Sequence, residues 1–197
     1  MLSSYIAGSI VAGSSVLSLN YGLYGSMISP YGNLARLNPD SISVAFIGNL
    51  FSPNRGLFVF VPWVPLSIMG FFIALLKRLD PIYLILAVYA LTHIIVVSSF
   101  PHWWGGFSYG PRLLVETMIP LSLLIIPIII SAWRSEHSNA LNLVFLFLIF
   151  VAFLIQVAGL NYLTAEWNAT PISVDEMPSR LWDWSDMQIL RFMRTTN

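Results

Sequence analysis

Long apolar stretches with almost no charge constrain the fold of this chain most strongly. Four windows, 57–76, 81–100, 113–132 and 140–160, are long enough at about 1.5 Å per residue to cross a hydrocarbon layer of about 30 Å. A fifth window, 2–19, carries no charge but is less apolar. Lipid offers no hydrogen-bond partner to the backbone, so such segments form helices. The sequence therefore predicts an all-α, polytopic membrane helix bundle with about five transmembrane helices.

The first window has a signal peptide as its alternative interpretation. A basic segment before it is missing, and serines interrupt its apolar run. Its small residues recur four apart, as at Gly8 and Ala12, a spacing that allows close approach of another helix. We therefore expect residues 2–19 to be a transmembrane helix.

Composition excludes several other classes of protein. Charged residues make up 9% of the chain, against roughly 25% in soluble domains, so a water-soluble globule is excluded. The formal net charge is zero, which argues against a nucleic-acid partner. The chain has no cysteine and no recognisable metal or nucleotide motif, so we expect no cofactor and no metal site of its own.

The short loops predict the orientation in the cytoplasmic (inner) membrane. With five spans, Lys77, Arg78 and Arg134 fall in two short loops on one side, and basic loops are typically cytoplasmic. The outer face then receives the loops rich in Trp, Tyr, Gly and Pro, including a short interfacial helix at 41–50. We expect a bundle over residues 1–161 and an outer tail over 162–197 with an interfacial helix.

Arg55 is the first candidate for binding an anion. It follows a Ser-Pro-Asn turn and comes directly before the 57–76 window. Backbone N–H groups and the helix dipole favour an anion there, and a guanidinium adds a fork suited to phosphate. The alternatives are that Arg55 reaches lipid headgroups or pairs with Asp40.

The loop 101–112 is the second candidate. It carries His102, Trp103, Trp104 and Tyr109 among three glycines and two prolines, which predict a specific turn. Aromatic faces around such a turn suit stacking on a sugar ring or covering a prenyl chain. The alternatives are an interfacial aromatic belt and, for His102, a structural role instead of proton transfer or hydrogen bonding.

Arg112 and Glu116 form the third candidate. Residues four apart share one face of an α-helix, so Arg112 and Glu116 can form an ion pair. The alternative is that Glu116 takes part in binding, because an ionisable residue in a span usually faces the protein interior or a wet cavity.

His93 lies near the middle of its window, where it predicts an interhelical hydrogen bond. Asn168-Ala169-Thr170 is a glycosylation sequon if the source is eukaryotic and the tail lumenal.

Four segments carry a resemblance to a known family. They are NYGLYGS, NLFSPNRGLFVFVP, HWWGGFSYGPRLL and RLWDWSDMQILR. In this order and spacing they resemble the C-terminal half of bacterial polytopic GT-C type glycosyltransferases, the mannosyltransferase-like and lipopolysaccharide-sugar-transferase-like membrane enzymes. The resemblance implies transfer of a hexosyl or pentosyl group from a polyprenyl-phosphate carrier to an acceptor, with inversion, in a cavity on the outer face. Arginines at helix starts would hold the lipid phosphate as its charge develops.

The sequence also departs from that family. Such enzymes carry an acidic residue or pair on the first outer loop, whereas Asp40 is the only carboxylate on this one and does not match the motif. We therefore expect the chain to be the latter part of such an enzyme, inactive alone, with an N-terminal half or another polytopic membrane protein as partner. A divalent metal of the complete enzyme would find no evident ligands here. The alternatives are a non-catalytic membrane partner or transporter subunit, and a structural membrane protein.

Overall fold

The computed structural model describes residues 2–29, 37, 42–133 and 138–193. Every regular element in those ranges is a helix, which confirms the predicted all-α class. The chain divides into two compact units, Met1–Leu37 and Asn38–Asn197. The helices after α1 and the tail belong to the second unit. The division into a membrane bundle and an outer tail at residue 161 stays a prediction.

The first unit consists of one long helix, α1 (Leu2–Tyr24). It continues five residues beyond the predicted window. It ends at Gly25, which adopts φ 66° and donates its N–H to the carbonyl oxygen of Tyr21 at 2.9 Å. A glycine in this left-handed conformation closes many helices because it has no Cβ to clash.

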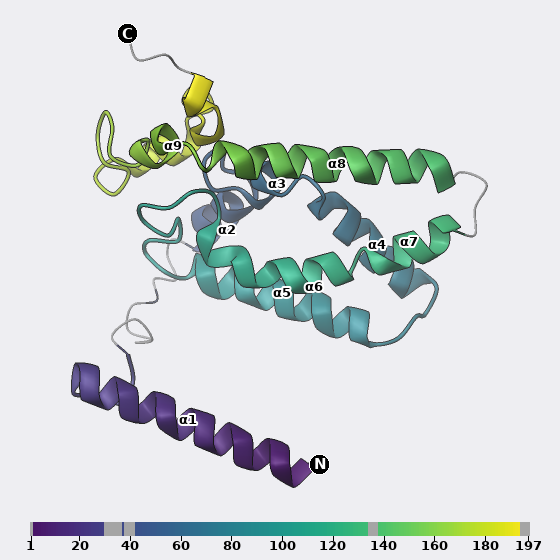
Figure 1. Ribbon diagram of the computed structural model, residues 1–197, viewed down its shortest axis with the longest axis horizontal. Coiled ribbons are helices and arrows are strands. Elements are labelled where there is room, and N and C mark those ends of the chain that lie inside the picture. Colours follow the sequence, from purple (N-terminus) through teal and green to yellow (C-terminus); the bar gives the residue numbers. More distant parts are fainter. Residues whose placement is uncertain (1, 30–36, 38–41, 134–137, 194–197) are drawn as a thin grey trace. The chain divides into compact units, whose positions relative to one another are not determined.

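The second unit contains the remaining helices. They are α2 (Ile42–Phe51), α3 (Leu57–Phe60), α4 (Val64–Leu76), α5 (Ile82–Ser98), the 3-10 helix η4 (Arg112–Thr117), α6 (Met118–Leu123), α7 (Ile126–Trp133), α8 (Ser138–Ala158), α9 (Tyr162–Glu166), and the 3-10 helices η5 (Pro178–Trp182) and η6 (Gln188–Met193). Helices α4 to α7 pack against one another (Figure 1). Helix α8 contacts α7 of this group and also contacts η6. The short helix α2 matches the one predicted at 41–50.

Three helical segments of the described chain are long and apolar enough to cross a membrane: Ile6–Tyr24, Arg112–Ser131 and Asn139–Ala158. Helix α5 has 17 residues and α4 has 13, which places them at or below the length that a bilayer requires. The structure thus supports a membrane protein with three candidate spans. Crossing by all five predicted windows stays a prediction.

Prolines break two of the predicted spans. The window 57–76 divides into α3 and α4 around Pro62, and the window 113–132 bends at Leu124, just before Pro127. A proline inside a helix lacks an N–H and its ring clashes with the carbonyl four residues earlier. At the second bend, Ile128 donates its N–H to the carbonyl of Ile125 at 2.9 Å, a tighter turn than an α-helix.

Apolar packing forms two clusters in the second unit. The larger one includes Leu57, Phe60, Leu114 and Leu121, and joins α3, α4, α5, η4 and α6. The smaller one consists of Ala45, Trp103, Trp104, Trp167, Val174 and Leu181. The smaller cluster lies beneath the loops at one end of the helices.

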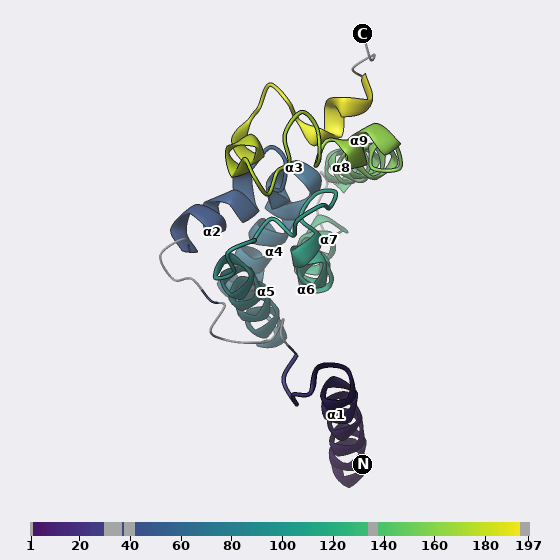
Figure 2. The same cartoon turned by 90° about the vertical axis from the view of Figure 1, so that its left-hand side faces the viewer.

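These loops build what we call the cap: residues 52–56, 101–111 and 161–193. Figure 1 shows the cap at one end of the second unit, with the loop of Lys77 and Arg78 at the other. Figure 2 looks at the unit from the cap end, with α2 and α9 on opposite sides. The loop of Lys77 and Arg78 thus lies at the opposite end of the second unit from the cap. The side of a membrane that each end faces stays a prediction, and Arg134 lies outside the described residues.

Candidate functional site

The turn at residues 52–56 holds the end of the tail. The Ser52 hydroxyl accepts the backbone N–H groups of Asn54 and Arg55 at 3.2 and 3.1 Å, and donates to the carbonyl of Leu181 at 2.6 Å. A Cβ on Gly56 would lie 2.4 Å from the carbonyl oxygen of Ser52, so the turn requires glycine there. The Ser-Pro-Asn-Arg-Gly sequence thus forms a docking point within the chain.

The guanidinium of Arg55 is the centre of the cap. Arg55 is 0% exposed. Its five N–H groups donate to the backbone carbonyls of Asn54, Trp104 and Gly106 and to the side-chain carbonyls of Asn168 and Gln188, at distances from 2.6 to 3.3 Å. An arginine has five N–H donors, so none remains for a further ligand.

This arrangement differs from the phosphate role that the sequence predicts for Arg55. Burial lowers the pKa of Arg55 to about 9, with the nearby Asp175 charge acting in the opposite direction. The side chain therefore stays charged at neutral pH, and neutral carbonyl groups accept its hydrogen bonds. In this arrangement Arg55 hydrogen-bonds to the loop 101–111 and to the tail, and it has no donor left for a lipid phosphate. Asp40, the alternative ion-pair partner, lies outside the described residues.

Gln188 is a second buried centre that the sequence analysis did not identify. Its Oε1 accepts from Arg55 at 2.7 Å and from the backbone N–H of Gly110 at 3.3 Å. Its Nε2 donates to the carbonyls of Ser108 and Thr164 at 3.0 and 2.8 Å. The residue thus joins the tail to all parts of the cap. No motif marks this glutamine in the sequence.

The tail arginines also have partners inside the cap. Arg180 lies over the ring of Trp167, 4.5 Å from its centroid, and its Nη2 donates to the Trp167 carbonyl at 2.8 Å. Asp186 forms ion pairs with Arg180 at 3.4 Å and with Arg191 at 2.6 Å. These charges stabilise the cap instead of facing a membrane surface.

Asn168, the first residue of the sequon, is 2% exposed. Its Oδ1 accepts from Arg55 at 2.6 Å and its Nδ2 donates to the carbonyl of Ala165 at 2.9 Å. A glycan would be attached to Nδ2, and the buried position of this side chain leaves no room for a sugar. The folded cap is therefore incompatible with glycosylation at Asn168.

The aromatic loop turns most of its rings inward. Trp103 packs against Gly48, where an added Cβ would lie 2.2 Å from the indole ring, and Trp104 donates its Nε1–H to Asp175 at 2.9 Å. The Tyr109 hydroxyl donates to the carbonyl of Ile155 at 2.5 Å, and burial raises the pKa of Tyr109. These three predicted ligand-facing side chains are packed within the fold.

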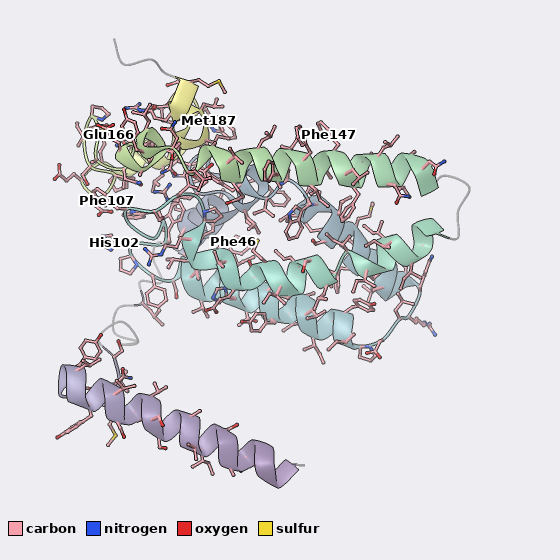
Figure 3. The ribbon with its side chains drawn as sticks, in the orientation of Figure 1. Phe46, His102, Phe107, Phe147, Glu166 and Met187 are labelled. Carbon is pink, nitrogen blue, oxygen red and sulfur yellow. The ribbon has the colours of Figure 1, made fainter. Side chains whose placement is uncertain are left out.

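His102 and Phe107 instead lie on the outside of the loop. His102 is exposed, with its ring centroid 4.9 Å from that of Trp104, and Phe107 is 55% exposed. Figure 3 shows both side chains at the cap end of the unit. Of the predicted aromatic-loop candidates, His102 is the one available to a ligand.

The turn predicted from the glycines of this loop is present. Gly105, Gly106 and Gly110 have φ values of 77°, 64° and 59°, a left-handed region that favours glycine. A Cβ on Gly110 would also lie 2.6 Å from the ring of Phe60.

Arg112 and Glu116 do not pair with each other. Both lie on η4, a 3-10 helix with about three residues per turn, so residues four apart point in different directions. The Glu116 carboxylate instead lies 3.4 Å from Nε2 of His93. Among the described residues, the exposed Arg112 side chain has no ion-pair partner. The helix type therefore overturns the predicted Arg112–Glu116 ion pair.

An apolar groove of about 440 Å³ lies between α2, α4, α5 and α6. Its walls are aromatic and aliphatic: Phe46, Leu50, Leu57, Phe58, Val64, Ile68, Phe71, Phe72, Ala87, Ala90, Leu91, Ile94, Leu121 and Leu124. Phe72 and Leu91 are 54% and 51% exposed, so the groove reaches the surface of the unit. The predicted site residues do not line this groove.

The described residues contain no group of three or more His, Asp or Glu side chains that could hold a metal. The chain matches no known protein family, no curated protein and no solved structure.

Proposed function

We propose that this chain is an integral membrane protein that binds a polyprenyl-phosphate-linked sugar and supplies the carrier-lipid side of a membrane glycosyltransferase. The apolar groove between α2, α4, α5 and α6 is the observation that carries the proposal. Its volume of about 440 Å³ lies within the range of ligand pockets, roughly 300–1,000 Å³. Burying hydrocarbon yields about 0.8 kcal/mol per CH₂, so such a groove can hold part of a prenyl chain.

Arg112 is the residue that we assign to the lipid phosphate. It is exposed, lies at the first position of η4, and begins the segment that also contributes Leu121 and Leu124 to the groove. A guanidinium can form two parallel hydrogen bonds to a phosphate. His102 and Phe107 lie on the neighbouring loop and are suited to contacts with the sugar.

The acceptor hydroxyl needs a base, which we assign to a second protein segment. Within the described cap, Asp175 accepts the Trp104 indole N–H and Asp186 pairs with two arginines. These two carboxylates have structural partners. The other carboxylates of the described cap, Glu166, Glu176 and Asp183, lie on the tail and not on the first outer loop, where the family that the sequence resembles carries its acidic motif. We therefore propose that the chain is inactive alone and acts with an N-terminal half or another polytopic protein, in the cytoplasmic (inner) membrane with the cap outside and the Lys77 loop inside.

Filling the groove tests the proposal. We expect Ala87→Phe to lower binding of a photoreactive polyprenyl phosphate by at least tenfold, because the new ring occupies space that the prenyl chain needs. Photo-cross-linking to the purified full chain in lipid nanodiscs would measure this. Ala140→Phe, at an exposed position of α8 outside the groove, is the matched control and should bind as the wild type does. Equal labelling of both variants would reject the groove as the lipid site.

Arg112→Gln tests the phosphate contact separately. We expect it to weaken binding of polyprenyl phosphate about tenfold while leaving the binding of the neutral polyprenol unchanged, because a phosphate contact of this kind is charge-assisted. Competition of each lipid against the photoreactive probe gives both values. Loss of binding for both lipids would show that the substitution disturbs the groove instead.

A further inference from the structure

Glu116 stands out among the membrane-spanning helices. Within the described parts of α1 to α8 and η4, it is the only carboxylate. It lies in the candidate span Arg112–Ser131, and its side chain is 73% exposed on the surface of the unit. Ionisable residues in spans normally face a protein interior or a wet cavity.

Among the described residues of the second unit, this carboxylate has one ion-pair contact, with His93. Nε2 of His93 on α5 lies 3.4 Å from Oε2 of Glu116, and Tyr89 stacks on the His93 ring at 6.3 Å between centroids. Nδ1 of His93 is buried without a hydrogen-bond partner. An ionised carboxylate can accept about four hydrogen bonds, so one long contact leaves most of its capacity unused.

The surroundings of Glu116 form a mixed surface that we call the Glu116 face: Tyr89 and His93 of α5 with Glu116 and Ile119 of η4 and α6. Tyr89 is 50% exposed and Ile119 is 70% exposed. The groove uses other positions of α5, such as Leu91 and Ile94, so the two surfaces are separate. The Glu116 face therefore combines a carboxylate and an imidazole with the exposed side chains of Tyr89 and Ile119.

We propose that the Glu116 face is the docking surface for a transmembrane helix of a different polypeptide, one that presents a lysine or arginine level with Glu116. An acidic side chain exposed to hydrocarbon is unfavourable in free energy, and a cationic hydrogen-bond donor on a covering helix lowers that cost. The opposite charge selects the partner, while Tyr89 and Ile119 supply packing area.

Charge argues against a second copy of this chain as the occupant. In a two-fold symmetric dimer the same patch meets itself, which would bring two Glu116 carboxylates together. Like charges at close range disfavour the ionised forms. A different polypeptide with a basic residue avoids this repulsion.

A defined helix pair tests the proposal in bilayers. The full chain, labelled with a donor fluorophore, is reconstituted in neutral phosphatidylcholine vesicles with an acceptor-labelled polyleucine helix of about 20 residues carrying one lysine. We expect energy transfer to show at least tenfold tighter association of this helix than of the same helix without lysine. Glu116→Gln should remove the difference, and Glu116→Asp should retain part of it.

Two controls decide between the other occupants. Leu146→Gln, at a position of α8 that is 61% exposed, should leave the preference for the lysine helix intact. Equal association of the lysine helix with the wild type and Glu116→Gln overturns the proposal. An unlabelled second copy of the chain can also be added as a competitor of the lysine helix. If it competes and the Glu116→Gln variant does not, the proposal is overturned in favour of self-association. Neither result bears on the groove, which the lipid cross-linking tests by itself.

Discussion

An Arg55→Ala variant is expected to lose about 3–5 kcal/mol of its free energy of unfolding, because several buried hydrogen bonds are lost at once. The substitution removes one donor from each of five carbonyl groups; those of Gln188 and Gly106 keep a backbone N–H donor, whereas Oδ1 of Asn168 has no other donor among the described residues. A buried polar group without a hydrogen bond costs about 1–3 kcal/mol, and partial collapse of the cap limits the sum. Arg55→Lys should also be destabilising, because an ammonium group cannot reproduce the planar fork.

Urea unfolding of the full chain in detergent micelles, followed by tryptophan fluorescence, measures this effect, since Trp104 and Trp167 report on the cap. Arg112→Ala is the matched control. Its side chain is exposed, so its free energy of unfolding should change by no more than about 0.5 kcal/mol. Similar losses in the two variants would contradict a structural role specific to Arg55.

A Gly70→Ala variant is expected to be destabilised by about 1–3 kcal/mol, although alanine usually favours a helix over glycine by about 0.5–1 kcal/mol. A Cβ at Gly70 in α4 would lie 1.9 Å from the carbonyl oxygen of Leu124. That oxygen belongs to the backbone at the bend between α6 and α7, so it cannot move aside as a flexible side chain would. The added methyl group must separate α4 from the bend.

Gly13→Ala in α1 supplies the comparison for Gly70→Ala, because nothing lies within 4 Å of a Cβ at Gly13. We expect Gly13→Ala to raise the helix content or leave it unchanged, and Gly70→Ala to lower the unfolding midpoint. Circular dichroism during thermal unfolding records both. A midpoint for Gly70→Ala at or above the wild-type value would refute the close packing at the bend.

Hydropathy predicted where the helices lie, because burial in lipid imposes long apolar segments. The window 140–160 and α8 (Ser138–Ala158) differ by two residues at each end, and α1 is longer than its window because a glycine after Tyr24 ends it. The helices break near Pro62 and Pro127, where a proline cannot continue the helical hydrogen bonding. Hydropathy did not predict the short lengths of α4 and α5, which leave five crossings unconfirmed.

The site could be predicted less well than the helices, because the same local residue pattern is compatible with both a binding role and a structural role. An arginine before a helix suits an anion, but Arg55 has five internal acceptors, and four of them come from three distant segments of the chain. Arg112 and Glu116 would share a face in an α-helix, and only the 3-10 geometry of η4 separates them. Gln188 lacks any local signal, since its role depends on residues 80 and 133 positions away in the chain.

The order of synthesis gives the Arg55 network a consequence for biogenesis. Arg55 leaves the ribosome long before Gln188, which lies 133 residues further along the chain. Until that last stretch emerges and reaches the same side of the bilayer, the guanidinium must remain hydrated or be shielded by the insertion machinery. Maturation of this protein therefore depends on synthesis of the segment around Gln188, and a nascent chain that stops before residue 188 should be recognised by quality-control proteases.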